Sequence, residues 1–263
     1  MLADTNGKVD AFRKDLQTGA VVRLSTGASG AQANAATTHV RMSTDGSRVV
    51  FVSTANGLVP GNTDGATDVL LRRLDTGSLT RISAAASQGR NQPNGAADIS
   101  PSGASAVFAT EDTSAGRCGQ VWTWDVASAT ASMKRKNCMD AEAWQGFPSV
   151  FALNQGFAVT RRMGFMGPRD TVTVPRPGQA GSYQVSYDVD DENGMDVAGL
   201  GGAVVGNEFT GLQRTAPDGS VTTLPYGVNP ALSDDARLVV FVDDGQIKTW
   251  DYRTGAVRLI SQR

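Results

Sequence analysis

The sequence predicts an all-β fold, a β-propeller of about six four-stranded blades. With the four strands of a blade lettered A to D in chain order, the first blade lacks strands A and B. Three observations support this prediction. A turn-and-strand pattern recurs three times, a second hairpin pattern alternates with it, and together they repeat at intervals of roughly 40–45 residues. No segment shows a helical period with capping residues.

The first pattern is an ungapped stretch that begins with Ser, turns through a short polar pair and ends in Phe eight residues later. Its copies are Ser43–Phe51, Ser100–Phe108 and Ser233–Phe241. Gly tolerates positive φ and Asp bonds its own backbone, so the pattern predicts a tight reversal between antiparallel strands. The third copy has Ala236 where the others have Gly, which predicts a turn that needs no glycine.

The second pattern is Thr-Gly followed by a short strand that ends in Ser. Its copies are Thr18–Ser25, Thr76–Ser83 and Thr254–Ser261, and residues 121–134 form a degenerate copy. An apolar or aromatic run precedes each copy, with the alternation of a strand that buries one face. The pattern therefore predicts a hairpin of two strands, C and D, after strands A and B.

The alternation predicts a single domain of stacked four-stranded units, because one thin meander cannot bury both of its faces alone. The expected units are a half-blade at 4–25 and blades near 37–83, 95–138, 141–181, 184–227 and 228–263. The blades at 141–181 and 184–227 are assigned mainly by spacing. Either strands A and B of the half-blade come from upstream sequence or another chain, or the middle blades are miscounted.

Composition excludes several classes of function. The 24 Lys and Arg against 26 Asp and Glu give a net charge of -2, which argues against a nucleic-acid binder. No apolar run approaches the roughly 20 residues of a membrane span. A single histidine, His39, removes most zinc, copper and haem chemistry and most acid–base catalysis by imidazole.

The two cysteines, Cys118 and Cys138, lie at equal distances from a small-residue turn centred on Ser128. Residues equidistant from a hairpin turn face one another across the ladder, which predicts a cross-strand disulfide; two reduced thiols are the alternative. A disulfide implies an extracellular or periplasmic protein. The first residues form no signal peptide, so we expect a mature segment rather than a cytosolic chain.

Two loops share the spacing D/N-x-D/N-G-x-x-D, which could wrap a hard cation because Gly permits a sharp turn that points alternate oxygens inward. The candidate calcium ligands are Asp4, Asn6 and Asp10 in the first loop and Asn62, Asp64 and Asp68 in the second. The alternative is that Asp, Asn and Gly cluster here because tight turns favour them. A bound ion would brace the loop.

The pattern resembles the TolB-like family of β-propellers, with its WD40-like repeat. The resemblance is carried by the strand pair Ser43–Phe51, the opening Asp4–Phe12 and the hairpin Asp15–Ser25. The loop Ala55–Val69 is similar to one in the family's secreted actinobacterial members. The resemblance implies a scaffold for interactions, often outside the cytoplasm and usually with six blades.

The predicted function is a non-catalytic scaffold that binds a protein, peptide or glycan, and we add the expectation that it is a module of a larger secreted protein. The alternative is a lyase or glycosidase that acts on carbohydrate in the central channel. The readable inner strands offer His39, Arg41 and Asp98 as channel-facing candidates for binding, among mostly small or apolar residues. That set is thin for catalysis, so no catalytic residue is assigned.

Overall fold

A computed structural model describes residues 4–15, 17–86, 91–112, 118–138, 150–152, 157–163, 169–175, 182–188, 196–198, 203–208, 211–223 and 227–260. Within these ranges the fold is all-β apart from one short 3-10 helix. No helix there is long and apolar enough to cross a membrane. The chain clusters into two compact units, Met1–Ala141 with Gly146–Val150 and Glu142–Gln145 with Phe151–Arg263, and each is described by itself.

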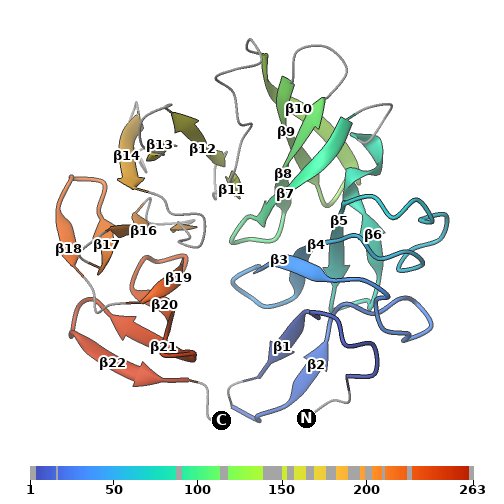
Figure 1. Cartoon of the computed structure of the whole chain (residues 1–263), viewed down its shortest axis with the longest axis horizontal. Coiled ribbons are helices and arrows are strands. Elements are labelled where there is room, and N and C mark those ends of the chain that lie inside the picture. Colours follow the sequence, from blue (N-terminus) through green and yellow to red (C-terminus); the bar gives the residue numbers. More distant parts are fainter. Residues whose placement is uncertain are drawn as a thin grey trace. The chain divides into compact units, whose positions relative to one another are not determined.

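The first unit contains a two-stranded sheet and two four-stranded sheets whose strand order follows the sequence (Figure 1). The small sheet pairs β1 (Phe12–Lys14) with β2 (Val21–Arg23). The next comprises β3 (Thr37–Met42), β4 (Arg48–Ser53), β5 (Asp68–Arg73) and β6 (Leu79–Arg81), followed by the 3-10 helix η1 (Ile82–Ala85). The third comprises β7 (Asn91–Ile99), β8 (Ser105–Asp112), β9 (Cys118–Asp125) and β10 (Thr130–Cys138).

The second unit contains three four-stranded sheets, again in sequence order. The first comprises β11 (Val150–Ala152), β12 (Phe157–Met163), β13 (Arg169–Pro175) and β14 (Ser182–Asp188). The second comprises β15 (Asp196–Val197), β16 (Val204–Glu208), β17 (Gly211–Thr215) and β18 (Val221–Thr223). The last comprises β19 (Val228–Leu232), β20 (Leu238–Asp243), β21 (Gln246–Asp251) and β22 (Ala256–Leu259).

These sheets confirm the all-β propeller-type architecture. Copies of the first pattern form the hairpins β3–β4, β7–β8 and β19–β20, and copies of the second form β1–β2, β5–β6 and β21–β22. The described residues form five four-stranded sheets and one two-stranded sheet, and a ring of six blades is not shown. In the middle of the chain β14 ends at Asp188, beyond the expected boundary at 181, because spacing alone located that boundary.

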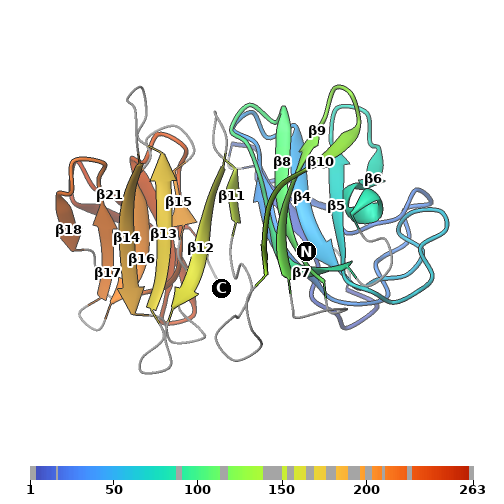
Figure 2. The same cartoon turned by 90° about the horizontal axis from the view of Figure 1, so that it is seen from above.

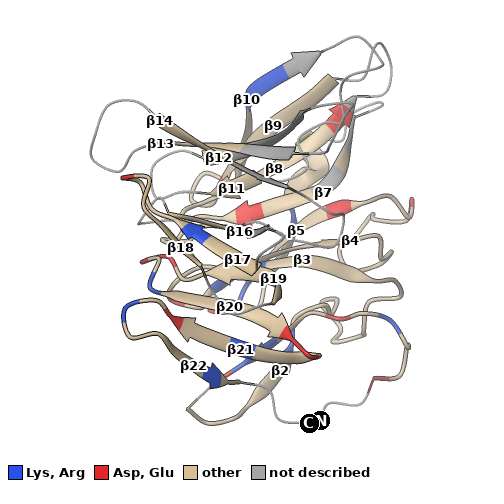
Figure 3. Cartoon of the chain, turned by 60° about the vertical axis from the view of Figure 1, so that its left-hand side comes forward, with Lys and Arg blue, Asp and Glu red and all other residues tan. Residues whose placement is uncertain are grey.

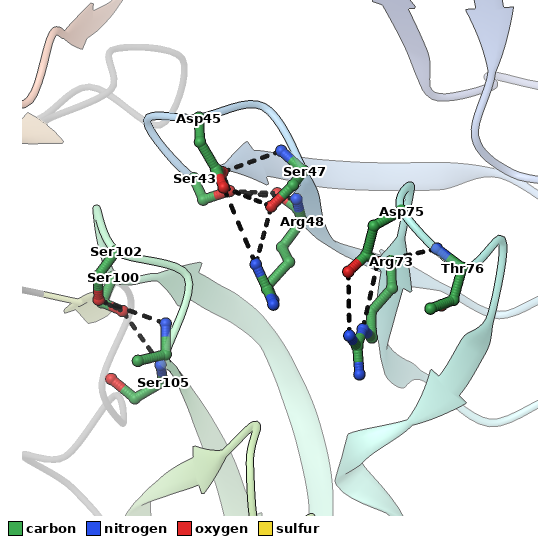
Figure 4. A network of polar contacts seen from close by, with 11 residues as sticks. Ser43, Asp45, Ser47, Arg48, Arg73, Asp75, Thr76, Ser100, Ser102 and Ser105 are labelled. Atoms are coloured by element: carbon green, nitrogen blue, oxygen red, sulfur yellow. Dashed lines mark hydrogen bonds and ion pairs between the residues drawn. The ribbon is translucent and has the colours of Figure 1, made fainter.

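The turn between strands A and B is built around its first serine (Figure 4). Ser43 Oγ donates to Asp45 Oδ1 at 2.6 Å and accepts from the Arg48 N–H at 3.1 Å. The Gly46 N–H donates to the Ser43 carbonyl at 2.8 Å, with φ +68° at Gly46. The hydrogen bond from the Ser43 hydroxyl, followed by those from the hydroxyl and N–H of Ser47, lowers the pKa of Asp45 to about 2.

The turn at Ala236 forms without glycine, as predicted, but it has the same geometry as the turns of the other two copies. The Ala236 N–H donates to the Ser233 carbonyl at 2.8 Å and its φ is +59°, so the third copy forms the same turn without glycine. A left-handed conformation costs an L-residue about 1–2 kcal/mol. The methyl group of Ala236 is buried against Ala198 and Ala203, and that contact offsets part of the cost.

The sheet β3–β6 buries both of its faces, because successive side chains of a strand point in opposite directions. One face packs on the small sheet and the other on β7–β10, where β7 and β8 lie beside β4 (Figure 2). The first cluster includes Val49, Phe51 and Leu70 with Ala11 and Leu24. The second includes Val50, Val52, Val69 and Leu71 with Ala97, Ile99 and Phe108. This two-sided burial is the stacking that the repeat predicted.

Candidate functional site

The first strand of three sheets carries a register irregularity ahead of its turn serine. The ladder register shifts between Thr38 and Arg41 in β3, between Pro93 and Ala97 in β7, and between Val228 and Ala231 in β19. Bulges of this kind bend a strand and re-aim its side chains, and they are enriched beside functional sites. The structure therefore singles out these first strands.

Two of the bulges hold a residue other than glycine in the left-handed region. His39 has φ +50° and Asn229 has φ +53°, and each lies four residues before the serine of its turn. Asn and His reach this region more readily than most residues, yet a conformation of this kind persists only where the surrounding structure imposes it. The two copies therefore share this conformation although the residue types differ.

Two of the three residues predicted to face the channel, Arg41 and Asp98, lie close together in the structure. Each lies two residues before the serine of its turn, on the neighbouring strands β3 and β7. Arg41 Nε and Asp98 Oδ1 are 4.0 Å apart, and the side chains are 35% and 11% exposed. Asp98 Oδ1 also accepts from the Ile99 N–H at 2.8 Å. The pair thus presents a partly exposed guanidinium beside an anchored carboxylate.

His39, the third predicted residue, is exposed, and its Nδ1 lies 3.3 Å from Thr38 Oγ1. Desolvation, and secondly the positive charge of Arg41, lower the pKa of His39 below its ordinary value. The ring is therefore neutral at pH 7 and offers one donor and one acceptor.

Asp196 is an equivalent residue that the sequence reasoning missed. The Ala198 N–H donates to the Ala203 carbonyl at 2.9 Å, as Ser43 does to Arg48, so Asp196 corresponds to Arg41. Asp196 Oδ2 accepts from the Leu232 N–H at 2.6 Å and is only 6% exposed. The signal was hidden because Ala198 replaces the serine that marks the other copies.

The first expected calcium loop forms a turn in which the aspartate oxygens face backbone N–H groups and an arginine side chain. Asp4 Oδ1 accepts from the N–H groups of Asn6 and Gly7, at 3.1 and 3.0 Å. Asp10 instead turns toward the second hairpin strand, where its Oδ2 lies 3.1 Å from Arg23 Nε. Ser25 Oγ donates to Asp10 Oδ1 at 2.6 Å.

The second loop repeats this arrangement. Asp68, whose side chain is fully buried, pairs with Arg81 Nε, accepts from Ser83 Oγ at 3.1 Å and accepts from Asn62 Nδ2 at 2.7 Å. Burial raises the pKa of Asp68, and Arg81 opposes that effect. Asp64 is exposed, with its Oδ2 3.6 Å from Arg81 Nη2.

The expectation of calcium-braced loops is not supported. Each loop directs its last aspartate to an arginine, Arg23 of β2 or Arg81 of β6, and to the serine two residues after that arginine, so a cationic side chain faces the carboxylate where a metal ion was expected. Within the described ranges, no group of three or more His, Cys, Asp or Glu side chains could hold a metal ion.

Cys118 and Cys138 face each other in the ladder between β9 and β10, as the position of the turn predicted. Cys118 is buried, at 5% exposed. The backbone pairing is confirmed, whereas the covalent bridge stays a prediction.

No protein-family model matches the sequence, and no curated protein matches it. Solved structures do resemble it. One is an oligogalacturonate lyase from Vibrio parahaemolyticus, 11% identical with a TM-score of 0.53 over 97% of this chain and 72% of that chain. Another is an oligogalacturonate lyase in complex with manganese, 12% identical with a TM-score of 0.55 over 97% and 71%.

A third similar structure is the acylaminoacyl peptidase of Pyrococcus horikoshii, 10% identical with a TM-score of 0.51. The match covers 96% of this chain but only 41% of the peptidase. Identities this low show the fold alone, a β-propeller arrangement.

Proposed function

We propose that this protein is a non-catalytic, TolB-like propeller module that binds a protein, peptide or glycan through the inner strands of its sheets. The observation that carries the proposal is the Arg41–Asp98 pair on neighbouring bulged strands, with His39 beside it. A guanidinium presented in this way recognises a carboxylate, and a neighbouring carboxylate accepts hydrogen bonds from hydroxyl or amide groups. A ligand that carries both kinds of group fits the site.

A carbohydrate lyase or glycosidase is the second candidate, favoured by the resemblance to oligogalacturonate lyases. Such chemistry needs a group free to move a proton. Asp98 is instead held by Arg41 and by the Ile99 N–H. These contacts support a binding role for Asp98 over proton transfer.

Oligogalacturonides are a suitable first probe because each unit carries a carboxylate and hydroxyl groups. We expect calorimetric binding without product formation, and we expect Arg41→Ala with Asp98→Ala to weaken binding at least tenfold. The matched control, Arg73→Ala with Asp75→Ala, removes an exposed ion pair of 3.0 Å and should leave binding unchanged. Turnover to an unsaturated product that collapses in the first variant would show an enzyme; no difference between the variants would contradict the site.

We also propose that the Cys118–Cys138 bridge forms and that the protein works in an oxidising, extracellular or periplasmic compartment. The direct backbone pairing of the two residues supports the bridge. A loop of this size gives a disulfide worth about 3 kcal/mol. Reduction should therefore add two hydrogens to the mass and lower the melting temperature. Two titratable thiols in the denatured, unreduced protein would contradict both proposals.

A further inference from the structure

The two-stranded sheet β1–β2 corresponds to the two outer strands, C and D, of the complete sheet that follows it. Asp10 and Ser25 make the contact that Asp68 and Ser83 make in the next sheet. The N–H groups that follow these aspartates donate to the same two serines, at 3.2 and 3.1 Å. By this equivalence β1 corresponds to β5, and Phe12 corresponds to Leu70.

In three complete sheets, strand B places a phenylalanine opposite that position of strand C. The cross-strand pairs are Phe51 with Leu70, Phe108 with Trp122 and Phe241 with Lys248. Phe12 has no such partner among the described residues, because the sheet there consists of β1 and β2 alone. It is 44% exposed, whereas Leu70 is fully buried.

The backbone of β1 also meets no partner strand on that side in the described part of the chain. The Leu24 N–H donates to the Ala11 carbonyl, and the Asp15 N–H donates to the Ala20 carbonyl, both at 2.8 Å. Backbone groups alternate in direction along an antiparallel ladder, so those of Phe12 and Lys14 point away from β2. In the described part of the chain no strand meets them, which leaves an open edge.

A second exposed residue marks the same missing surface. Met42 lies one residue before its turn serine, as Ile99 does. Ile99 is 4% exposed, because it packs against Val50 and Val52 of the preceding sheet, whereas Met42 is 50% exposed. Strands A and B of the small sheet would cover Met42 as Val50 and Val52 cover Ile99. A hairpin on β1 would therefore continue the interface already made by Ala11 and Leu24.

We propose that the open edge of β1 binds a β-hairpin with the pattern of strands A and B, supplied by a separate polypeptide segment. In the bound form the hairpin places its final Phe opposite Phe12 and the valine two residues before it opposite Lys14, as β4 does with β5. This mode is strand addition: main-chain bonds supply affinity, and the alternating apolar residues supply specificity.

A synthetic peptide that copies Thr37–Ser53 is the probe, because it is the chain's own hairpin of this pattern. We expect it to bind the full chain one-to-one, to protect the Phe12 and Lys14 amides from hydrogen exchange, and to shift the methyl resonance of Met42. Phe12→Asp should weaken binding at least tenfold. The control Val221→Asp changes an apolar residue that is 55% exposed on β18 and should have no effect.

Three results would overturn the proposal. One is the absence of binding with both amides left unprotected. Another is binding that survives Phe12→Asp. The third is a homodimer in sedimentation whose Phe12 amide is already protected, which would assign the edge to a second copy.

Discussion

Arg72→Met is expected to lower the free energy of unfolding by about 3–5 kcal/mol, because it removes the three hydrogen bonds that a buried guanidinium donates to backbone carbonyls. Arg72 lies on β5 and is 7% exposed. Its Nη1 donates to the Gly77 carbonyl at 2.9 Å, and its Nη2 donates to the carbonyls of Leu24, at 3.1 Å, and Thr26. Leu24 and Thr26 follow β2, so one guanidinium ties two sheets together. Methionine keeps much of the apolar stem but donates no hydrogen bond.

Arg73→Met is the matched control for this change. Arg73 is the next residue, but its side chain is 36% exposed and pairs with exposed Asp75. An exposed pair contributes about 0–1 kcal/mol, so this variant should unfold near the wild-type urea concentration. In Arg72→Met, the backbone amides of β2 should exchange their hydrogens faster than in the wild type. Equal stabilities for the two variants would show that the guanidinium of Arg72 does not hold the sheets together.

The repeats carried most of what could be predicted about the fold. Where Ser, a polar turn and a terminal Phe recur, the hairpins β3–β4, β7–β8 and β19–β20 form as expected, because turn chemistry and strand alternation are local. The sheets near Phe157 and Leu212 carry neither pattern, so spacing alone placed them. The strands there are specified by burial against neighbouring sheets, which a single sequence does not display.

The candidate site was predictable as a set of residues but not as an arrangement. The position before the turn identified Arg41 and Asp98, yet their pairing depends on β3 lying beside β7. The spacing of aspartates in the loops suggested a cation because the loop sequence alone does not show which distant side chains will face those carboxylates. The groups that satisfy Asp10 and Asp68 are Arg23 and Arg81, which lie 13 residues downstream and reach them only when the hairpin closes.

Gly227 shows how a position without any sequence signal becomes restrictive once the sheets pack. It is buried just before the last sheet, and a Cβ there would overlap Cδ2 of Phe241 and lie within 3.2 Å of two further ring atoms. Phe241 is 1% exposed in a cluster with Val205, Leu212 and Trp250, so its ring has little room to move.

Gly227→Ala is therefore expected to lower the free energy of unfolding by about 2–3 kcal/mol, the cost of overpacking a tight core. The measurement is urea unfolding of four proteins: the wild type, Gly227→Ala, Phe241→Leu and the double variant. Leucine frees the space that the new methyl group requires, so the double variant should be more stable than the sum of the single changes predicts, by more than about 0.5 kcal/mol. Strict additivity would mean that the Gly227 methyl group and the Phe241 ring do not meet, and the close approach of these two residues in the last sheet would then be wrong.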